Sequence, residues 1–151
     1  MKNIQPRLVK LFKEGYCTPQ IGRIARAIDE PSTTIHYNIK KLEKEGVIKT
    51  YKAVFDYKKI NEGFCVYVLI SLASKQYSDP ENIARTLARQ KEVESVDILT
   101  GDWELIVKVR VGSQDEYYDF LKKVIAKQEG IRKTKSMISL RHIKTEFVSF
   151  L

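Results

Sequence analysis

The sequence predicts an α+β protein in which a group of short helices precedes a four-stranded sheet with two further helices. Apolar residues recur at helical spacing up to about residue 45, and after residue 63 they alternate or cluster in short β-branched segments. The polar segment DYKKINEG, residues 56–63, lies between the two patterns and ends in glycine. We therefore expect two domains, at 1–55 and 64–151, joined by a linker at 56–63.

Two helices are expected before residue 30. The first places its apolar residues at i, i+4, i+7 and i+8 from Ile4, with Pro6 in the first turn, where a missing N–H costs nothing. The second is expected to begin with Thr18 as N-cap and Pro19 as its first helical residue. It should end before Pro31, because the residue preceding a proline avoids helical geometry.

The third predicted helix covers residues 31–45 and has two unlike faces. Ile35, Ile39 and Leu42 fall on one side when residues are placed at about 100° per step. The opposite side carries hydroxyl, aromatic and basic side chains, namely Thr33, Tyr37, Lys40 and Lys44, flanked by His36 and Lys41. The tight connection between the second and third helices predicts a helix-turn-helix. Residues 47–55 are rich in β-branched and aromatic types and predict a strand, which would serve as the wing of a winged helix-turn-helix or as a connector to the next domain.

The second domain is predicted to have the order β-α-β-β-α-β. The strands are expected at 64–73, 93–99, 103–111 and 134–147, and the helices at 79–90 and 113–128. Asp79 and Ser113 are the expected helix caps, and Ser113 with Glu116 predicts a capping box. The order is ferredoxin-like and places both helices on one side of the sheet. An apolar open face would favour dimerisation.

The charge distribution indicates an anionic partner for the N-terminal part. The net charge is +8. Residues 1–62 hold 13 Lys/Arg against 7 Asp/Glu, and residues 63–151 hold 14 against 12. A solvated lysine-rich surface is the alternative explanation. Because the sequence has no long apolar run, no signal-like N-terminus and no disulfide framework, we expect a cytoplasmic protein without a membrane partner.

Two segments resemble the Lrp/AsnC, or feast/famine, transcription regulators. Residues 32–56, STTIHYNIKKLEKEGVIKTYKAVFD, are similar to that family's recognition helix and following strand. The matching residues are Thr34, Ile35, Ile39, Leu42, Glu43, Gly46, Val47, Ile48, Tyr51 and Ala53. Residues 99–109, LTGDWELIVKV, resemble the family's T-G-D-[YW]-D hairpin. The chain departs from the pattern at Asn38, where arginine is common, at Glu104, where aspartate is more frequent, and in lacking a D-x-x-D lead-in.

The resemblance implies a helix-turn-helix followed by a ferredoxin-like RAM domain. Family members form dimers through their sheets and assemble into tetramers or octamers. Small molecules, usually amino acids, bind between RAM domains and change assembly or DNA affinity. We therefore expect double-stranded DNA, a small-molecule effector and further copies of the chain as partners.

The outward face of the third helix is the candidate DNA site. Its residues are Ser32, Thr33, His36, Tyr37, Lys40, Lys41 and Lys44. The lysines would meet phosphates, and Thr33, His36 and Tyr37 would reach base edges in the major groove. Ser32 has two interpretations, as a helix cap or as a phosphate contact. A merely solvated face is the alternative for the whole set.

The hairpin turn is the candidate effector site. Thr100, Gly101, Asp102 and Glu104 form it, since glycine permits close backbone approach and a carboxylate would pair with an amino group. The family's T-x-[ST] segment in the last strand adds Thr134 and Ser136 to the implied set. A plain hairpin turn, which favours Gly and Asp, is the alternative. Trp103 is expected to be a core or interface aromatic.

The sequence favours a transcription regulator over an enzyme. Asp102 and Glu104 suggest an acid–base pair, but no nucleophile, phosphate loop or metal-ligand cluster accompanies them. His36, His142, Cys17 and Cys65 lack ligand spacing, so we expect no metal and no cofactor. Two alternatives remain: an architectural DNA-compacting protein with low sequence specificity, and an amino-acid sensor that acts through protein contacts.

Overall fold

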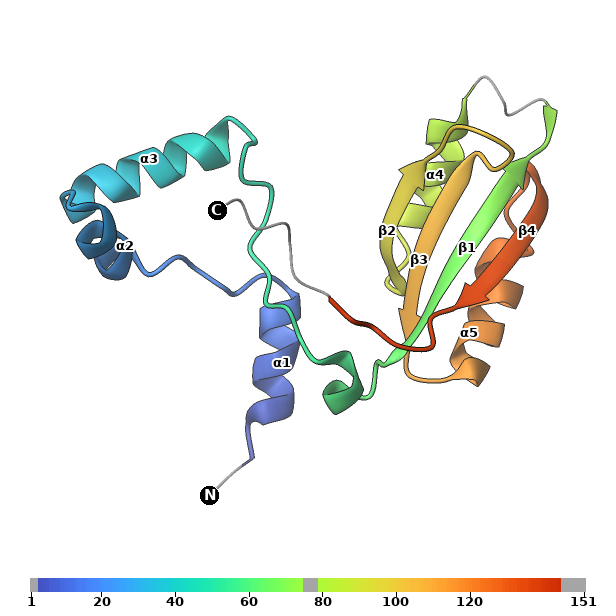
Figure 1. The fold of residues 1–151 in the computed structure, drawn as a ribbon, viewed down its shortest axis with the longest axis horizontal. Coiled ribbons are helices and arrows are strands. Elements are labelled where there is room, and N and C mark those ends of the chain that lie inside the picture. The colour runs from blue at the N-terminus through green and yellow to red at the C-terminus, as the bar shows by residue number, and fades with distance from the viewer. Residues whose placement is uncertain (1–2, 75–78, 145–151) are drawn as a thin grey trace. The chain divides into compact units, whose positions relative to one another are not determined.

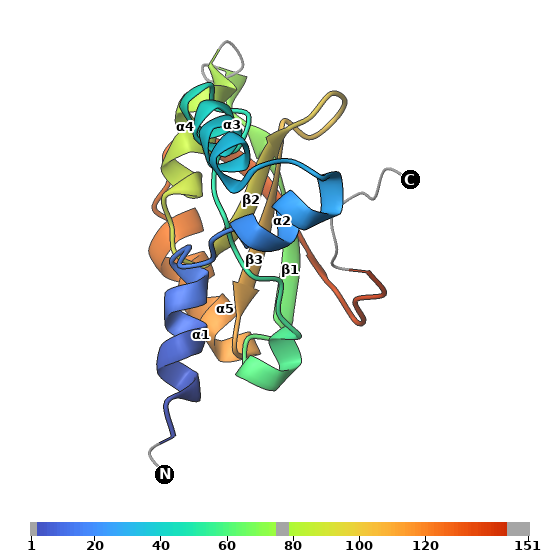
Figure 2. The same ribbon diagram turned by 90° about the vertical axis from the view of Figure 1, so that its left-hand side faces the viewer.

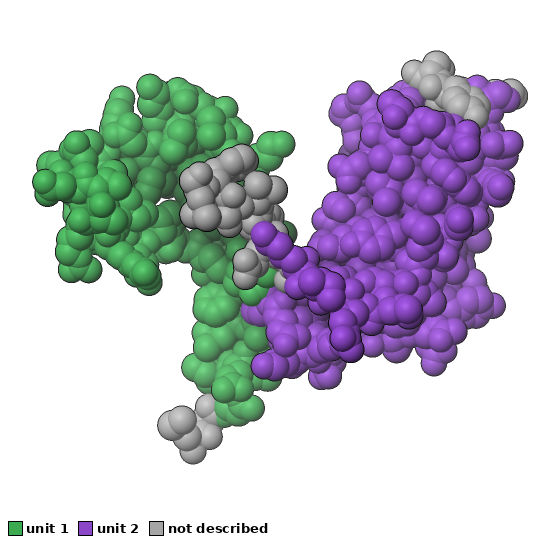
Figure 3. Space-filling model, in the orientation of Figure 1, with its two compact units in different colours: residues 1–54 green, residues 55–151 purple. Residues whose placement is uncertain are grey.

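The computed structural model describes residues 3–74 and 79–144. It divides into two compact units, residues 1–54 and 55–151 (Figure 3). No helix in these described stretches is long and apolar enough to cross a membrane. Because each unit has its own packing, the two are described separately.

The first unit contains the three predicted helices (Figure 1). They are α1 (Gln5–Lys13), α2 (Ile21–Ile28) and α3 (Ser32–Lys44). Pro6 lies in the first turn of α1, as predicted. The predicted start of α2 is wrong, because the helix begins at Ile21 and Gln20 occupies the cap position without a side-chain hydrogen bond. The apolar residues of α2 begin at Ile21, so the start of the helix is determined by packing against α3 and not by the Thr18–Pro19 pair.

The strand predicted at 47–55 is also wrong. These residues join no ladder in the described structure and lead to a short 3-10 helix, η1 (Tyr57–Ile60). Asp56 caps η1 by accepting a hydrogen bond from the Lys58 amide. A β-branched composition favours a pleated surface but cannot supply a pairing partner. The helix-turn-helix is therefore present in this unit without a wing strand.

The second unit has the predicted β-α-β-β-α-β order. Its elements are β1 (Phe64–Leu72), α4 (Pro80–Ala88), β2 (Val93–Ile98), β3 (Leu105–Val111), α5 (Gln114–Phe120), the π-helical turn η3 (Leu121–Ile125) and β4 (Ile131–Ile138). The four strands form an antiparallel sheet in the order β2-β3-β1-β4. Figure 2 shows α4 and α5 on one side of this sheet. The ferredoxin-like prediction is confirmed.

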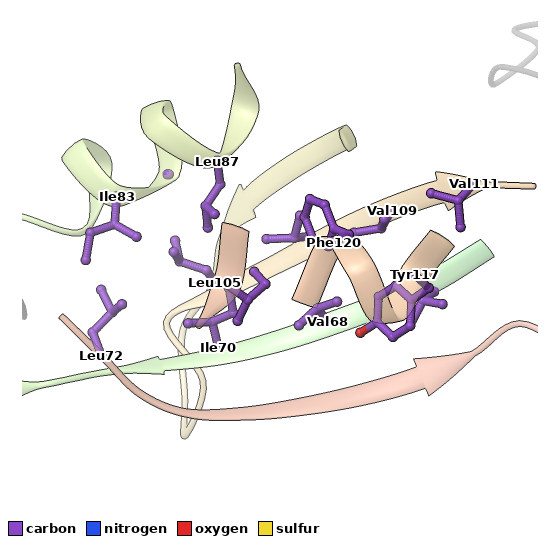
Figure 4. Close-up of a cluster of buried hydrophobic side chains, with 14 residues drawn as sticks. Val68, Ile70, Leu72, Ile83, Leu87, Leu105, Val109, Val111, Tyr117 and Phe120 are labelled. Carbon is purple, nitrogen blue, oxygen red and sulfur yellow. The ribbon is translucent and has the colours of Figure 1, made fainter. Parts of the chain in front are cut away.

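The core of this unit lies between the sheet and its helices (Figure 4). Alternate residues of the two central strands point into it, so β3 buries Leu105, Val107, Val109 and Val111, as its alternation predicted. Leu87 of α4 and Phe120 of α5 cover these strands. The arrangement leaves the opposite sheet face, with Tyr67, Leu69, Ile106 and Met137, outside the core.

Helix caps in the second unit follow the sequence closely. Asp79 accepts a hydrogen bond from the Asn82 amide, and Ser113 accepts one from the Glu116 amide. The capping box is half formed, because Glu116 Oε2 accepts from the Gly112 amide at 2.8 Å rather than from Ser113. The helix predicted at 113–128 is shorter in α form, since α5 continues as the π-helical turn η3.

Two strand limits differ from the prediction. The last strand begins at Ile131, directly after the left-handed turn at Gly130, and ends at Ile138, where its pairing with β1 runs out at Val66. Residues 139–144 are therefore not a strand, and residues 145–147 of the prediction lie outside the described residues. The third strand begins at Leu105 because the two residues before it belong to the hairpin turn.

Candidate DNA interface and effector site

The packing of α2 against α3 orients the candidate DNA face. Ala25 of α2 and Ile35 of α3 are the buried residues of these two helices. Asp29 ends α2 in the left-handed conformation at φ 54°, which aspartate tolerates better than most side chains. Pro31 occupies the N-cap position of α3. This tight turn directs Ile35 inward and leaves the polar side of α3 outward, whereas Leu42 of the predicted apolar side remains 38% exposed.

Every predicted DNA-contact residue is exposed on α3. The set comprises Ser32, Thr33, His36, Tyr37, Lys40, Lys41 and Lys44. Tyr37 is 69% exposed, compared with 38% for Leu42 of the same helix. Ser32 is the first helical residue, and no side-chain cap bond forms at this end, so its predicted capping role is not found. The face therefore has the predicted composition and accessibility.

A carboxylate that the site prediction did not include positions one of these lysines. Lys40 Nζ donates to Glu43 Oε2 at 2.8 Å, and Tyr51 Oη donates to Glu43 Oε1 at 3.1 Å. The hydrogen bond to Glu43 raises the pKa of Lys40, and the same bond lowers the pKa of Glu43. The i, i+3 spacing of Lys40 and Glu43 is the sequence signal for this pair. Tyr51 lies beyond the helix, so its contribution had no such signal.

The hairpin turn between β2 and β3 packs against the end of β1. Gly101 has φ +104°, a conformation that glycine adopts without strain. The Leu99 amide donates to the Glu104 carbonyl at 2.8 Å, and the Glu104 amide donates to the Ile70 carbonyl at 3.0 Å. Glu104 Oε2 accepts from the Leu72 amide at 2.7 Å. The Glu104 carboxylate thus ties the turn to the last residue of β1.

A pocket of about 450 Å³ opens beside this turn. Its size falls within the range of small-molecule sites. Three elements contribute to it: the turn, the end of β1 and the start of β4. The lining residues are Gly101, Asp102, Trp103 and Glu104 from the turn, Ser71 from β1, and Arg132 and Lys133 from β4.

Basic and aromatic side chains supply the part of this pocket that the sequence did not predict. Arg132 Nη2 donates to Ser71 Oγ at 2.8 Å. Lys133 Nζ lies 5.3 Å from the centre of the Trp103 ring. Trp103 therefore lines the pocket instead of the core. The sequence signal for the basic part was the adjacent pair Arg132–Lys133, which lies between the predicted helix at 113–128 and the predicted strand at 134–147. In a regular strand, two adjacent residues would point to opposite faces.

The structure separates the other predicted effector residues from this pocket. Ser136 Oγ is hydrogen-bonded to Tyr117 Oη at 2.5 Å, between the sheet and α5. Thr134 pairs with Ile70, a core residue of β1, and so lies on the same sheet face as Ser136. Thr100 belongs to the exposed turn but does not line the pocket. Of the six predicted effector residues, Gly101, Asp102 and Glu104 line it.

A second ionic cluster lies on the open sheet face. Glu94 accepts hydrogen bonds from Lys108 Nζ at 2.7 Å and from Arg110 Nε at 2.5 Å. Tyr57 of η1 covers the Arg110 guanidinium, whose central carbon is 3.7 Å from the ring centre. Burial alone would raise the pKa of Glu94, but the hydrogen bonds from Arg110 and Lys108 outweigh it and lower that pKa. In the described part of the chain, no group of three His, Cys, Asp or Glu residues is arranged to hold a metal ion.

Comparison with known proteins assigns the family. Residues 65–148 match the model of the Lrp/AsnC ligand binding domain, which is more than half of the chain. The protein belongs to the Lrp/AsnC family. This Lrp/AsnC chain is 30% identical over 126 residues to an uncharacterized HTH-type transcriptional regulator of Pyrococcus furiosus, covering 83% of this chain and 84% of the relative. It is 28% identical over 141 residues to the HTH-type transcriptional regulator FL11 of Pyrococcus horikoshii, covering 93% and 90%.

Solved structures of family members have the same fold. An AsnC family transcriptional regulator from Agrobacterium tumefaciens is 26% identical with a TM-score of 0.72, covering 96% of this chain and 94% of that chain. The feast or famine regulatory protein of M. tuberculosis, solved as a complex with L-methionine, is 22% identical with a TM-score of 0.73, covering 93% and 91%. These matches confirm a helix-turn-helix followed by a RAM domain in this Lrp/AsnC chain.

Proposed function

We propose that this Lrp/AsnC protein is a cytoplasmic transcription regulator that binds double-stranded DNA through the outward face of α3. The observation that carries the proposal is the exposed cationic and hydroxyl-bearing face above a buried Ile35. Lysines at 40, 41 and 44 supply phosphate contacts, and Thr33, His36 and Tyr37 are placed to read base edges. The helix N-terminus, with Thr33, enters the groove first.

The second part of the proposal is regulation by an amino acid bound in the pocket beside Gly101. An L-methionine complex of the M. tuberculosis relative supports this assignment by analogy. Asp102 and the two basic residues of β4 offer partners for the charged groups of a zwitterion. Ligand binding would bias assembly and, through it, DNA affinity.

The third part is self-assembly through the open sheet face. Tyr67, Leu69, Ile106 and Met137 present apolar surface there, opposite the side that α4 and α5 cover (Figure 2). Such a face is covered by a second copy in many sheets of this kind. We propose a homodimer that assembles further into a tetramer or an octamer. Sedimentation velocity on the purified protein measures this state directly.

Fluorescence anisotropy with the DNA upstream of the protein's own gene tests the DNA assignment. The double variant K40Q/K44Q should weaken binding and reduce the slope of log K against log salt by about 0.9 for each lost phosphate contact. The K91Q variant is the matched control, since Lys91 is a highly exposed lysine of the second unit. Equal slopes for K40Q/K44Q and K91Q would refute the assignment of the α3 face.

A separate comparison distinguishes regulation from DNA compaction. A regulator should bind its own promoter at least 10³-fold more tightly than random DNA, whereas an architectural protein has a ratio near one. The T33A variant should lower this ratio about tenfold, because a lost base contact relaxes specificity without changing the salt slope.

A further inference from the structure

One row of side chains across the open sheet face carries opposite charges at its two ends. Asp97 of β2 pairs with Ile106 of β3, Ile106 pairs with Leu69 of β1, and Leu69 pairs with Lys135 of β4. A sequence neighbour of each residue contacts the core or its helices, so these four side chains belong to the opposite, open face. From β2 to β4 the row is therefore acidic, apolar, apolar and basic.

The two charges of this row have no partner within the described part of the chain. Asp97 and Lys135 are exposed, and no hydrogen bond or ion pair joins either of them to another described residue. Glu94 of β2, in contrast, already accepts from Lys108 and Arg110. The row therefore offers one anion at the β2 edge of the sheet and one cation at the β4 edge to another molecule.

We propose that this row aligns a second copy of the chain, with Asp97 of each copy paired to Lys135 of the partner subunit. This inference rests on the proposed self-assembly through the open face and specifies its orientation and its selective contact. The strand order is β2-β3-β1-β4. A twofold axis parallel to the strands, midway between β3 and β1, therefore places β2 of one copy over β4 of the other. Each row then faces the same row of the second copy, and Ile106 packs on Leu69 of the partner subunit.

Charge distinguishes this orientation from the other way of facing two sheets. A twofold axis perpendicular to the strands would place β2 over β2 and β4 over β4. The basic edges, with Lys133 and Lys135 on this face, would then repel each other. In the proposed orientation the sheets lie about 10 Å apart, and an extended lysine and an aspartate together bridge that gap. A partner chain without the reciprocal charges would leave both edges unpaired, so the row selects a second copy of this chain.

Charge reversal tests the orientation by sedimentation velocity on the full-length protein. D97K and K135D should each weaken the dimer about tenfold, because each change creates two repulsive pairs across the twofold axis. The double variant D97K/K135D should restore the affinity, since it exchanges the two charges and keeps both pairs. K91D is the matched control, because Lys91 is a highly exposed lysine in the turn before β2. All three positions are exposed, so thermal unfolding of each variant should match that of the unaltered protein.

A mixture of the two single variants gives a second, independent measurement. A heterodimer of D97K with K135D contains two attractive pairs, whereas each homodimer contains two repulsive pairs. Native mass spectrometry of the mixture should therefore show heterodimers well above the proportion expected from random mixing. D97K/K135D mixed with the unaltered protein should show the reverse, because both pairs of that heterodimer are repulsive.

The outcomes separate this inference from the proposed self-assembly. Random mixing, a double variant as weak as the single variants, or a K135D dimer tighter than the unaltered dimer would overturn the orientation and leave self-assembly in place. An unaltered protein that remains monomeric at every concentration would overturn both proposals. DNA affinity, measured separately, would still test the α3 face.

Discussion

The Glu94 carboxylate should be a principal polar contributor to the stability of the second unit. It holds Arg110, whose side chain is only 5% exposed, and Lys108, whose side chain is 20% exposed. Removing one partner of a buried ion pair costs about 3–5 kcal/mol. Glu94 itself is 33% exposed, so water compensates part of that cost, and glutamine keeps one acceptor oxygen. We expect E94Q to lower the free energy of unfolding by about 2 kcal/mol.

Urea unfolding followed by tryptophan fluorescence measures this change. Trp103 is the single tryptophan of the chain and belongs to the same unit as Glu94. In a thermal scan, about 2 kcal/mol corresponds to a Tm decrease of roughly 10 °C for a domain of this size. E81Q is the control, since Glu81 makes an equally short bond to exposed Arg85 and should cost about 0.3–0.5 kcal/mol. If E94Q and E81Q cost the same, the energetic argument is wrong.

Acidification should remove the same contribution. The folded-state pKa of Glu94 lies below the ordinary value for a glutamate, because Arg110 and Lys108 donate hydrogen bonds to its carboxylate. The carboxylate therefore stabilises the fold fully above the unfolded-state pKa, and this contribution is lost as pH falls through the folded-state pKa. As the pH falls below about 5, the free energy of unfolding should thus decrease less for E94Q than for the unaltered protein. Parallel acid unfolding curves for the two proteins would contradict the assignment.

Two further predictions concern packing and hydrogen bonding. Y117F should lower the free energy of unfolding by about 1 kcal/mol, because buried Tyr117 loses its hydrogen bond to Ser136. In urea unfolding, the double variant Y117F/S136A should cost less than the sum of the two single variants. G112A should destabilise the protein by about 1–3 kcal/mol, because its Cβ would lie 2.8 Å from the Asn61 carbonyl oxygen. In the same thermal scans, G22A should stabilise it by about 0.5–1 kcal/mol, because the space around its Cβ in α2 is open. A G112A protein as stable as G22A would show that the close approach relaxes freely.

Local sequence rules predicted most elements of the fold. Asp79 and Ser113 were identified as caps because a short polar side chain just before an apolar helical pattern can accept a hydrogen bond from an amide of the first helical turn. The alternation in β3 was equally informative, because the side chains of a strand that is buried on one face must point alternately toward the core and away from it. The start of α2 and the strand at 47–55 depended on packing and pairing partners, and neither property can be read from local composition.

Only part of the pocket beside the hairpin turn could be predicted, because its remaining residues depend on strand register. The turn residues Gly101, Asp102 and Glu104 were found because turn chemistry is local. Arg132 and Lys133 were missed because they precede the strand predicted at 134–147, whereas β4 begins at Ile131. A regular strand would, moreover, place two adjacent residues on opposite faces. An irregularity where Ser71 pairs with Lys133 and Leu72 with Ile131 leaves Arg132 as an extra residue, so both basic side chains reach the pocket. Ser136 is three residues after Lys133 in the same strand, so its side chain points to the opposite face of the sheet, toward α5.

The stacking of Tyr57 on Arg110 also shortens the free connection between the two units. The first unit ends at Val54, and Tyr57 is already anchored on the sheet of the second unit. Two intervening residues provide about 7 Å of slack when fully extended. The two units are therefore joined by a two-residue tether, which cannot lengthen at its C-terminal end unless Tyr57 leaves Arg110.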